Sequence, residues 1–248
     1  MKKISIICPL RPRWPDGLRG LMKALETTAS DPSSIEVLVK VDHSDKETQE
    51  LIRSINTPFS FRHIIMDGLY GRISVPEYTN TLAWNSTGEI IWWLSDEVRV
   101  KTHGWDRIIW DRVSPVLSKP AVFHPIGGAF YPLITRRLMN LVGRFTFSIA
   151  LDSYLAICTG PLRHYKAIPV DNTLPIEWEH ASAANQYGDD RSTRIDKKMK
   201  DLFLEDMVNR SKWDAFNMDL NEPKVKTIFR EVAQELLDHF GIKHKPWW

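Results

Sequence analysis

Short apolar runs alternate with amphipathic segments over the first hundred residues of the chain. Most of the runs are rich in β-branched and aromatic residues, which is typical of strands, and they lie at residues 4–8, 35–41, 61–66 and 90–94. Between the first two runs, hydrophobic residues recur at helical spacing, for example at Leu18, Leu21 and Leu25. This alternation predicts an α/β fold with a mainly parallel central sheet.

Local signals indicate where two of the helices begin. Ser44 and Glu47 have the spacing of a capping box, which predicts that a helix begins at Ser44. Pro76 suits the first turn of another helix, which we expect to run to about Asn85. The run behind Met1 stops at Arg11-Pro12-Arg13 with no small-residue cleavage site, so it predicts a buried strand rather than a signal peptide.

The pattern after residue 100 is less regular. Helical spacing and short apolar runs predict helices at 105–113, 133–142 and 149–157 and strands at 121–123 and 167–170. From about residue 196 the sequence becomes charged and helical in character. We therefore expect one domain over residues 1–195, with halves at 1–100 and 101–195, and a helical C-terminal extension over residues 196–248.

Composition narrows the class of protein. The 248 residues are 43% hydrophobic and carry a net charge of +2 with interspersed charges, which gives no reason to expect a nucleic acid partner and excludes collagen-like and disordered chains. Only Cys8 and Cys158 occur, in no metal-binding motif, and this favours a reduced, cytoplasmic setting. No run approaches the roughly 20 apolar residues of a membrane span.

Polar side chains follow the predicted strands, where ligands bind in open α/β sheets. They are Arg11 and Arg13, Asp42, Asp67 and the triplet Ser95-Asp96-Glu97. Two adjacent acids at the end of a buried strand are costly unless something compensates their charge. The triplet is therefore either a solvated turn or a site for a hard cation such as Mg²⁺ or Mn²⁺.

Several stretches of the chain occur together in an order that is typical of one enzyme family. They are Ile4–Pro9, Val39–Asp45, Tyr78–Asn80, Thr87–Ile91, Leu94–Glu97, Gly104–Asp106 and Asp152–Leu155. In this order the chain resembles a family-two glycosyltransferase with the GT-A fold over roughly residues 1–185. The resemblance implies an open α/β/α sandwich, with a nucleotide-sugar-binding half before residue 100 and an acceptor half after it.

The resemblance also implies a site for a nucleotide sugar. Asp42 would lie beside the nucleobase, with Pro9 and Arg11 near the same pocket. Asn80 would belong to the same site. On charge grounds, either Arg72 or the pair Arg191 and Arg194 could add positive charge near the diphosphate. From the residues alone, Asp42 has a second interpretation, because next to Ser44 it could serve only the start of a helix.

A metal site is implied at the acidic triplet. Asp96 would face the ribose or the metal, and Glu97 and His180 would bind the cation, Mn²⁺ or Mg²⁺. Ser95 departs from the family pattern because it replaces the first acid, which puts the metal geometry in question. Without the resemblance, His180 is more simply interpreted as a hydrogen-bonded structural histidine, because a lone histidine is more often structural than a metal ligand.

Asp152 matches the position of the catalytic base in the resemblance. It stands within an apolar segment, where a carboxylate is costly unless it is paired or functional. One base on the face opposite the leaving group predicts inversion at the anomeric carbon. Trp178 and Tyr131 are candidates for a surface on which a sugar ring stacks.

The function that we expect is sugar transfer from a UDP-, GDP- or TDP-sugar to a glycan or another hydroxyl acceptor. Two alternatives stay open: a non-catalytic nucleotide- or glycan-binding protein, and a sugar-phosphate nucleotidyltransferase. Against the latter, Pro9-Leu10-Arg11-Pro12-Arg13 is not a glycine-rich phosphate loop. The C-terminal extension could contact a membrane surface or a second copy of the chain. We expect the protein in the cytoplasm, where this extension could also place it at the periphery of a membrane.

Overall fold

The computed structural model describes residues 3–10, 15–66, 75–126, 131–143, 145, 168–181, 234, 238, 239 and 241. The strands are β1 (Ile4–Pro9), β2 (Ile35–Asp42), β3 (Ser60–Met66), β4 (Ile90–Trp93), β5 (Val98–Val100), β6 (Val122–Pro125), β7 (Leu133–Thr135), β8 (Val170–Leu174) and β9 (Trp178–His180). The helices are α1 (Pro15–Thr28), α2 (Lys46–Ser54), α3 (Val75–Asn85), α4 (Trp105–Val113) and α5 (Arg136–Val142), with short 3₁₀ turns at Pro32–Ser34 and Ser114–Val116. The predicted helix at 149–157 and the C-terminal extension lie outside the described residues, apart from isolated positions near the end.

Seven strands form one mixed sheet in the order β3-β2-β1-β4-β7-β6-β8. Neighbouring strands are parallel except at β7, which runs antiparallel to both β4 and β6. A separate two-stranded ribbon pairs β5 with β9. The predicted α/β fold with a mainly parallel sheet is confirmed, and the carboxyl ends of β1, β2 and β4 lie at one edge of the sheet.

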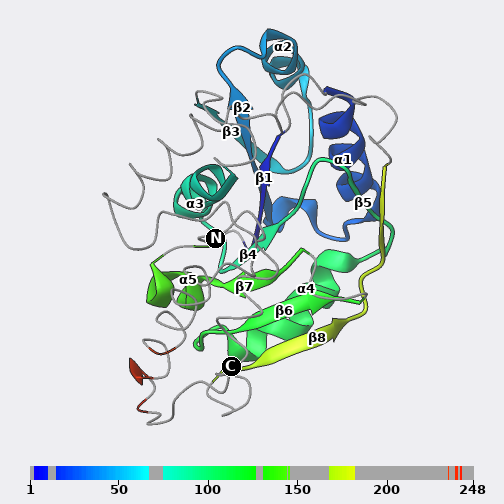
Figure 1. Ribbon diagram of the computed structural model, residues 1–248. Helices are drawn as coiled ribbons and strands as arrows, with labels where there is room; N and C mark the ends of the chain where they lie inside the picture. Colours follow the sequence, from blue (N-terminus) through cyan, green and yellow to red (C-terminus); the bar gives the residue numbers. More distant parts are fainter. Residues whose placement is uncertain are drawn as a thin grey trace, which may run out of the picture.

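Helices cover both faces of the sheet (Figure 1). On one face, alternate residues such as Ile6, Val37 and Trp92 join a core with α1 and α4, where the rings of Trp92 and Trp105 lie 5.3 Å apart. The opposite face packs mainly against α3. None of the helices in the described part of the chain is both long enough and apolar enough to span a membrane.

The predicted helix at 133–142 is partly wrong. Its first three residues form β7, and only Arg136–Val142 is helical. Leu133 and Ile134 pair with both β4 and β6 and are buried, so pairing on both sides outweighs their helical spacing. Thr135 then caps α5 by accepting a hydrogen bond from the backbone N–H of Leu138.

The predicted helix start at Ser44 is off by one residue. Asp45 is the N-cap of α2, and its carboxylate accepts hydrogen bonds from both the N–H and the hydroxyl of Thr48. Aspartate and serine are both good N-caps, and here the Asp45 side chain satisfies two donors of Thr48 at once. The carboxylate of Asp42 takes no part in this cap. The strand predicted at 167–170 is displaced as well, because β8 runs from Val170 to Leu174.

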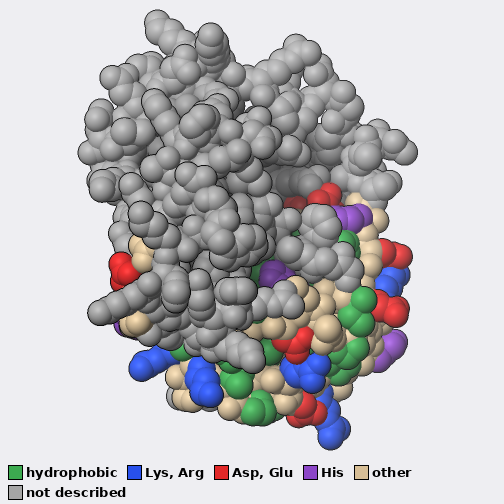
Figure 2. Space-filling model, turned by 60° about the horizontal axis from the view of Figure 1, so that its bottom comes forward, with side chains coloured by type: hydrophobic (Ala, Val, Ile, Leu, Met, Phe, Trp, Pro, Cys, Tyr) green, Lys and Arg blue, Asp and Glu red, His purple; other side chains and the backbone are tan. Residues whose placement is uncertain are grey.

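Charges of both signs occur close together on the described part of the surface. Figure 2 shows basic, acidic and hydrophobic side chains interspersed over the coloured part of one face. Exposed ion pairs such as Arg19–Asp16 and Arg107–Asp111 lie within single helices. Pairs of this kind contribute at most about 1 kcal/mol each to stability.

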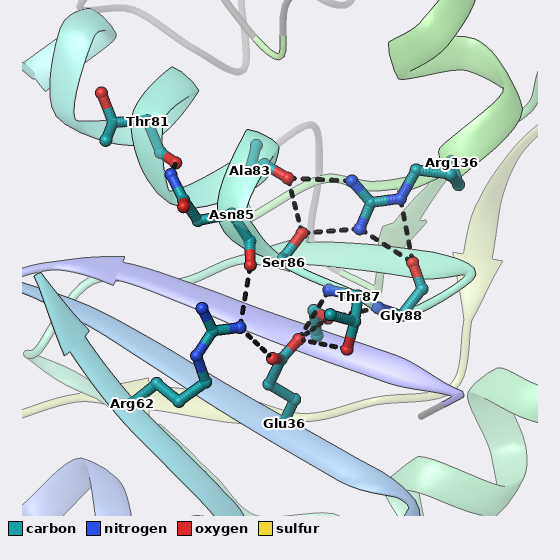
Figure 3. A network of polar contacts seen from close by, with 10 residues as sticks. Glu36, Arg62, Thr81, Ala83, Asn85, Ser86, Thr87, Gly88 and Arg136 are labelled. Carbon is teal, nitrogen blue, oxygen red and sulfur yellow. Dashed lines mark hydrogen bonds and ion pairs between the residues drawn. The ribbon is translucent and has the colours of Figure 1, made fainter. Parts of the chain in front are cut away.

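A buried polar network holds the amino-terminal edge of the sheet (Figure 3). Glu36 on β2 is 2% exposed, and its carboxylate accepts hydrogen bonds from the Ser5 hydroxyl, from the N–H and hydroxyl of Thr87, and from Arg62. Arg136 donates nearby to the carbonyls of Gly88 and Ala83 and to the hydroxyl of Ser86. These bonds tie β1, β2, α3 and α5 together at the edge opposite the carboxyl ends of the strands.

We expect Glu36→Gln to lower the free energy of unfolding by roughly 3 kcal/mol, because an amide cannot accept the same set of donors. Burial acts to raise the pKa of Glu36, but the bonds from Ser5, Thr87 and Arg62 outweigh it and hold the pKa below its ordinary value. The stabilisation is therefore present above pH 4.5 and is lost as the pH falls through the pKa of the folded state. Urea denaturation of both proteins between pH 3 and 7 measures this, and equal pH dependence would contradict it.

Gly88 has no room for a side chain. A Cβ there would lie 2.6 Å from the backbone nitrogen of Ser5 and 2.7 Å from its hydroxyl. Because the obstacle is a central strand, we expect Gly88→Ala to lower the free energy of unfolding by about 3 kcal/mol. Gly143→Ala, at a helix end with φ of 76° and open space, should cost only about 1 kcal/mol. Equal losses in chemical denaturation would contradict the steric argument.

Candidate functional site

The carboxyl ends of three strands bring several of the predicted residues to one edge of the sheet. Pro9 at the end of β1 is in register with Lys40, two residues before Asp42. On the other side of β1, Leu94 donates its backbone N–H to Ile7, and Ser95, Asp96 and Glu97 follow directly. This edge is where open α/β sheets bind ligands.

The acidic triplet forms a tight turn between β4 and β5. The backbone N–H of Val98 donates to the carbonyl of Ser95, and Asp96 is 1% exposed. Arg99 holds the turn from behind, since its Nη1 lies 2.7 Å from the carbonyl of Asp96 and 2.9 Å from that of Val98. Burial lowers the pKa of Arg99, and the attraction of Asp96 opposes this shift.

Arg99 explains a glycine within a helix. A Cβ at Gly20, within α1, would overlap the guanidinium of Arg99. Glycine inside a helix costs about 1 kcal/mol of stability relative to alanine. At position 20, the absence of a side chain leaves room for the guanidinium of Arg99. The sequence analysis did not identify Arg99, because nothing local marks the contact between β5 and α1.

The ribbon of β5 and β9 brings His180 beside Glu97. Val98 is in register with His180, and the backbone N–H of Ala181 donates to the carbonyl of Glu97 at 2.7 Å. The Nδ1 atom of His180 lies 3.6 Å from Oε1 of Glu97. Two residues that the resemblance assigned to one metal site therefore lie side by side, although they are distant in the sequence.

Ser95 and Tyr131 complete a ring of polar groups with this pair. The Ser95 hydroxyl lies 3.4 Å from Oε1 of Glu97 and 3.1 Å from the Tyr131 hydroxyl, which is 3.4 Å from Nδ1 of His180. A hydroxyl at position 95 can donate to one neighbour and accept from another. A carboxylate in its place would put a second negative charge beside Glu97.

Aromatic side chains stand behind the polar ring. Tyr131 stacks on Trp93 with ring centroids 5.4 Å apart. Its ring meets Trp178 edge-on at 4.8 Å and lies tilted against His180 at 5.8 Å. Its backbone has a φ of 53°, in the left-handed region that bulky residues rarely adopt, and the indole N–H of Trp92 holds its carbonyl. Such strain persists where the surroundings fix it, commonly at functional sites. Tyr131 is only 5% exposed and stacks on Trp93, so it does not fit the predicted sugar-stacking role, whereas Trp178 is partly exposed beside the acidic turn.

Asp42 lies at the end of β2 in contact with a buried lysine. Lys40 forms an ion pair with one carboxylate oxygen of Asp42, and its ammonium lies 3.8 Å from the centre of the Tyr78 ring. Burial lowers the pKa of Lys40 to about 8, and the attraction of Asp45 opposes this shift. Lys40 is therefore still an ammonium group at neutral pH.

Of the remaining predicted residues, the described structure places only Asn80. The side-chain oxygen of Asn80 accepts a hydrogen bond from the backbone N–H of Phe145 at 2.8 Å, which is a contact within the fold. Outside the described residues lie Arg11, Arg72, Asp152, Arg191 and Arg194.

The donors at the turn fit a metal ion only in part. Within the described ranges, no group of three or more His, Cys, Asp or Glu side chains is arranged to hold a metal ion. Glu97 and His180 supply one carboxylate and one imidazole. Since Mg²⁺ and Mn²⁺ often use one or two protein ligands together with substrate phosphates and water, this pair fits a cation that arrives with a diphosphate.

No family model and no curated protein matches the sequence. The structure, however, is similar to that of the fragment 1–349 of TarS from S. aureus, with 14% identity and a TM-score of 0.53 over 97% of this chain and 72% of that one. It is also similar to the mannosyltransferase PcManGT from Pyrobaculum calidifontis, with 11% identity and a TM-score of 0.57 over 98% and 76% of the chains. The chain has the GT-A glycosyltransferase fold.

The GT-A fold that the resemblance implied is confirmed, while the division into a nucleotide-sugar-binding half and an acceptor half stays a prediction. TarS has been solved in complex with UDP-GlcNAc, in a structure with a TM-score of 0.52 and 13% identity to this chain over 96% of it and 73% of TarS. PcManGT has been solved in complex with GDP-Man and Mn²⁺. At such low identity the similarity establishes the fold alone, and the roles of individual residues rest on the geometry described above.

Proposed function

We propose that the chain is a glycosyltransferase that moves a sugar from a nucleoside diphosphate sugar to a hydroxyl acceptor, with inversion and with help from a divalent cation. The main support is the arrangement of Glu97 and His180, which the β5–β9 ribbon holds 3.6 Å apart at the ligand-binding edge of a GT-A sheet. Asp42 lies at the end of a neighbouring strand of the same sheet. An acidic turn and a base-binding carboxylate at one edge suit a ligand with a nucleobase at one end and a diphosphate at the other.

Each residue has a proposed task. Asp42 accepts a hydrogen bond from the nucleobase, while Glu97 and His180 bind the cation and Asp96 faces the ribose or the metal. A bound divalent cation would offset the negative charge that grows on the departing diphosphate. Asp152 takes the proton of the acceptor hydroxyl, on the side of the sugar opposite the leaving group.

The decisive experiment measures turnover of UDP-, GDP- and TDP-sugars, with and without Mn²⁺ and with simple glycan acceptors. Sugar transfer, or slow hydrolysis that releases a nucleoside diphosphate, supports the proposal. Release of pyrophosphate from a nucleoside triphosphate and a sugar phosphate would instead identify a nucleotidyltransferase. Binding of nucleotides or glycans without turnover would identify a non-catalytic binding protein.

A further inference from the structure

Lys40 and Asp42 form a buried pair at the end of β2 that the sequence analysis did not anticipate. Residues two apart in a strand point to the same face, and the two side chains are only 2% and 7% exposed. A buried ammonium is costly unless it is compensated. Here the compensation comes from the Asp42 carboxylate and from the face of the Tyr78 ring on α3.

The backbone of Asp42 is fixed as firmly as its side chain. Its carbonyl accepts hydrogen bonds from the backbone N–H of Asp45 at 3.0 Å and from the side-chain amide of Gln49 at 2.9 Å. The same amide also donates to the carbonyl of His43 at 2.9 Å. The carboxylate is thus presented at the strand end in one orientation, as a group that selects a ligand by geometry requires.

The two oxygens of this carboxylate are not equivalent. Lys40 occupies Oδ1, and among the described residues none donates a hydrogen bond to Oδ2. Because the ammonium of Lys40 lies on Oδ1, a flat ligand can approach the carboxylate in its own plane only through Oδ2. Asp42 therefore offers a ligand one acceptor rather than two.

Nucleobases differ in how many donors they offer to a carboxylate. Guanine presents two adjacent donors, N1–H and N2–H, which pair best with both oxygens of a carboxylate. Uracil and thymine present a single N3–H, which needs one oxygen. Cytosine presents its N4 amino group as a donor, but the adjacent N3 carries a lone pair that a carboxylate oxygen repels.

We propose that Lys40 is a specificity-determining residue, which turns Asp42 into a single acceptor and so selects uracil or thymine nucleotides over guanine nucleotides. The inference rests on the proposed function, because it assumes that Asp42 meets the nucleobase of the donor. It goes further in naming the base and the residue that selects it.

Calorimetric titration with UDP, TDP, GDP and CDP in the presence of Mn²⁺ tests the inference. The wild-type protein should bind UDP or TDP about tenfold more tightly than GDP, the difference that one lost hydrogen bond makes. Lys40→Met frees Oδ1 and should remove most of this preference. Lys40→Gln keeps a donor on Oδ1 and should retain it.

Glu36→Gln is the matched control, since Glu36 is buried on the same face of β2 at the opposite edge of the sheet. It should lower stability without changing the ratio of UDP to GDP affinity, and comparing ratios within each variant removes any general loss of folding. A wild-type preference for GDP or CDP overturns the inference, as does an unchanged ratio in Lys40→Met. If Lys40→Met does not fold, the wild-type preference decides. Failure to bind any of the four nucleotides contradicts the proposed function itself.

Discussion

A Glu97→Gln variant should lose the effect of Mn²⁺ on nucleotide binding and transfer sugar about 100-fold more slowly than the wild type, a loss of roughly 3 kcal/mol in transition-state stabilisation. The substitution removes one negative charge but keeps a side-chain oxygen for the hydroxyl of Ser95. Because the Glu97 side chain is partly exposed, the free energy of unfolding should change by less than about 1 kcal/mol. Titration with UDP and GDP, each with and without Mn²⁺, measures the binding effect directly.

Glu179→Gln provides the control for this variant. Glu179 neighbours His180 on β9, but its carboxylate pairs with Lys101 on the exposed side of the ribbon. The charge change is the same as in Glu97→Gln, and Glu179 is adjacent to His180 in the sequence. A general effect of charge near the site would therefore appear in both variants. Equal responses to Mn²⁺ in the two proteins would remove Glu97 from the metal site.

An Asp152→Asn variant should lower the rate of transfer by about 100- to 10,000-fold, which is the usual contribution of a general base. Asparagine has nearly the same shape but cannot take a proton from the acceptor hydroxyl. The affinity for the nucleoside diphosphate should stay within about twofold of the wild type, because the base acts on the acceptor and not on the donor. Single-turnover rates and calorimetric titration of the nucleotide separate the two effects.

Asp171→Asn tests whether loss of any carboxylate from this half of the chain has the same consequence. Asp171 lies on β8 at the outer edge of the sheet and pairs with Arg112 at 2.7 Å. Its replacement should leave the rate of transfer within about twofold of the wild type. Normal turnover in the Asp152 variant would exclude that residue as the base and would require another carboxylate in its place.

The framework of the fold could be predicted because its strands carry strong local signals. The run at 90–94 is apolar on both faces and alternates with helical segments, so β4 was expected as an interior strand. Leu133–Thr135 misled the prediction, because its residues suit either a helix or a strand and only pairing with β4 and β6 decides. The three-residue strands β5 and β9 are too short to produce a periodic signal, and each is stabilised by a partner far away in the sequence.

The site could be predicted only where position alone carries the information. Asp42 and the triplet after β4 follow strands, and the carboxyl ends of parallel strands meet at one edge. The contact between Arg99 and Gly20 and the backbone conformation of Tyr131 depend on packing between distant segments. The pairing of Lys40 with Asp42 was hidden for another reason, since a lysine in a strand ordinarily reaches solvent.

The β5–β9 ribbon has an energetic consequence. Glu97 immediately precedes one of its strands and His180 ends the other, so a ligand held by both side chains also clamps the two strands against each other. The binding free energy of such a ligand is then coupled to the free energy of pairing β5 with β9. Any loss of pairing free energy lowers the binding free energy by the same amount. Substitutions elsewhere in the chain that weaken the pairing of these six residues should therefore lower the affinity for the ligand without contacting it.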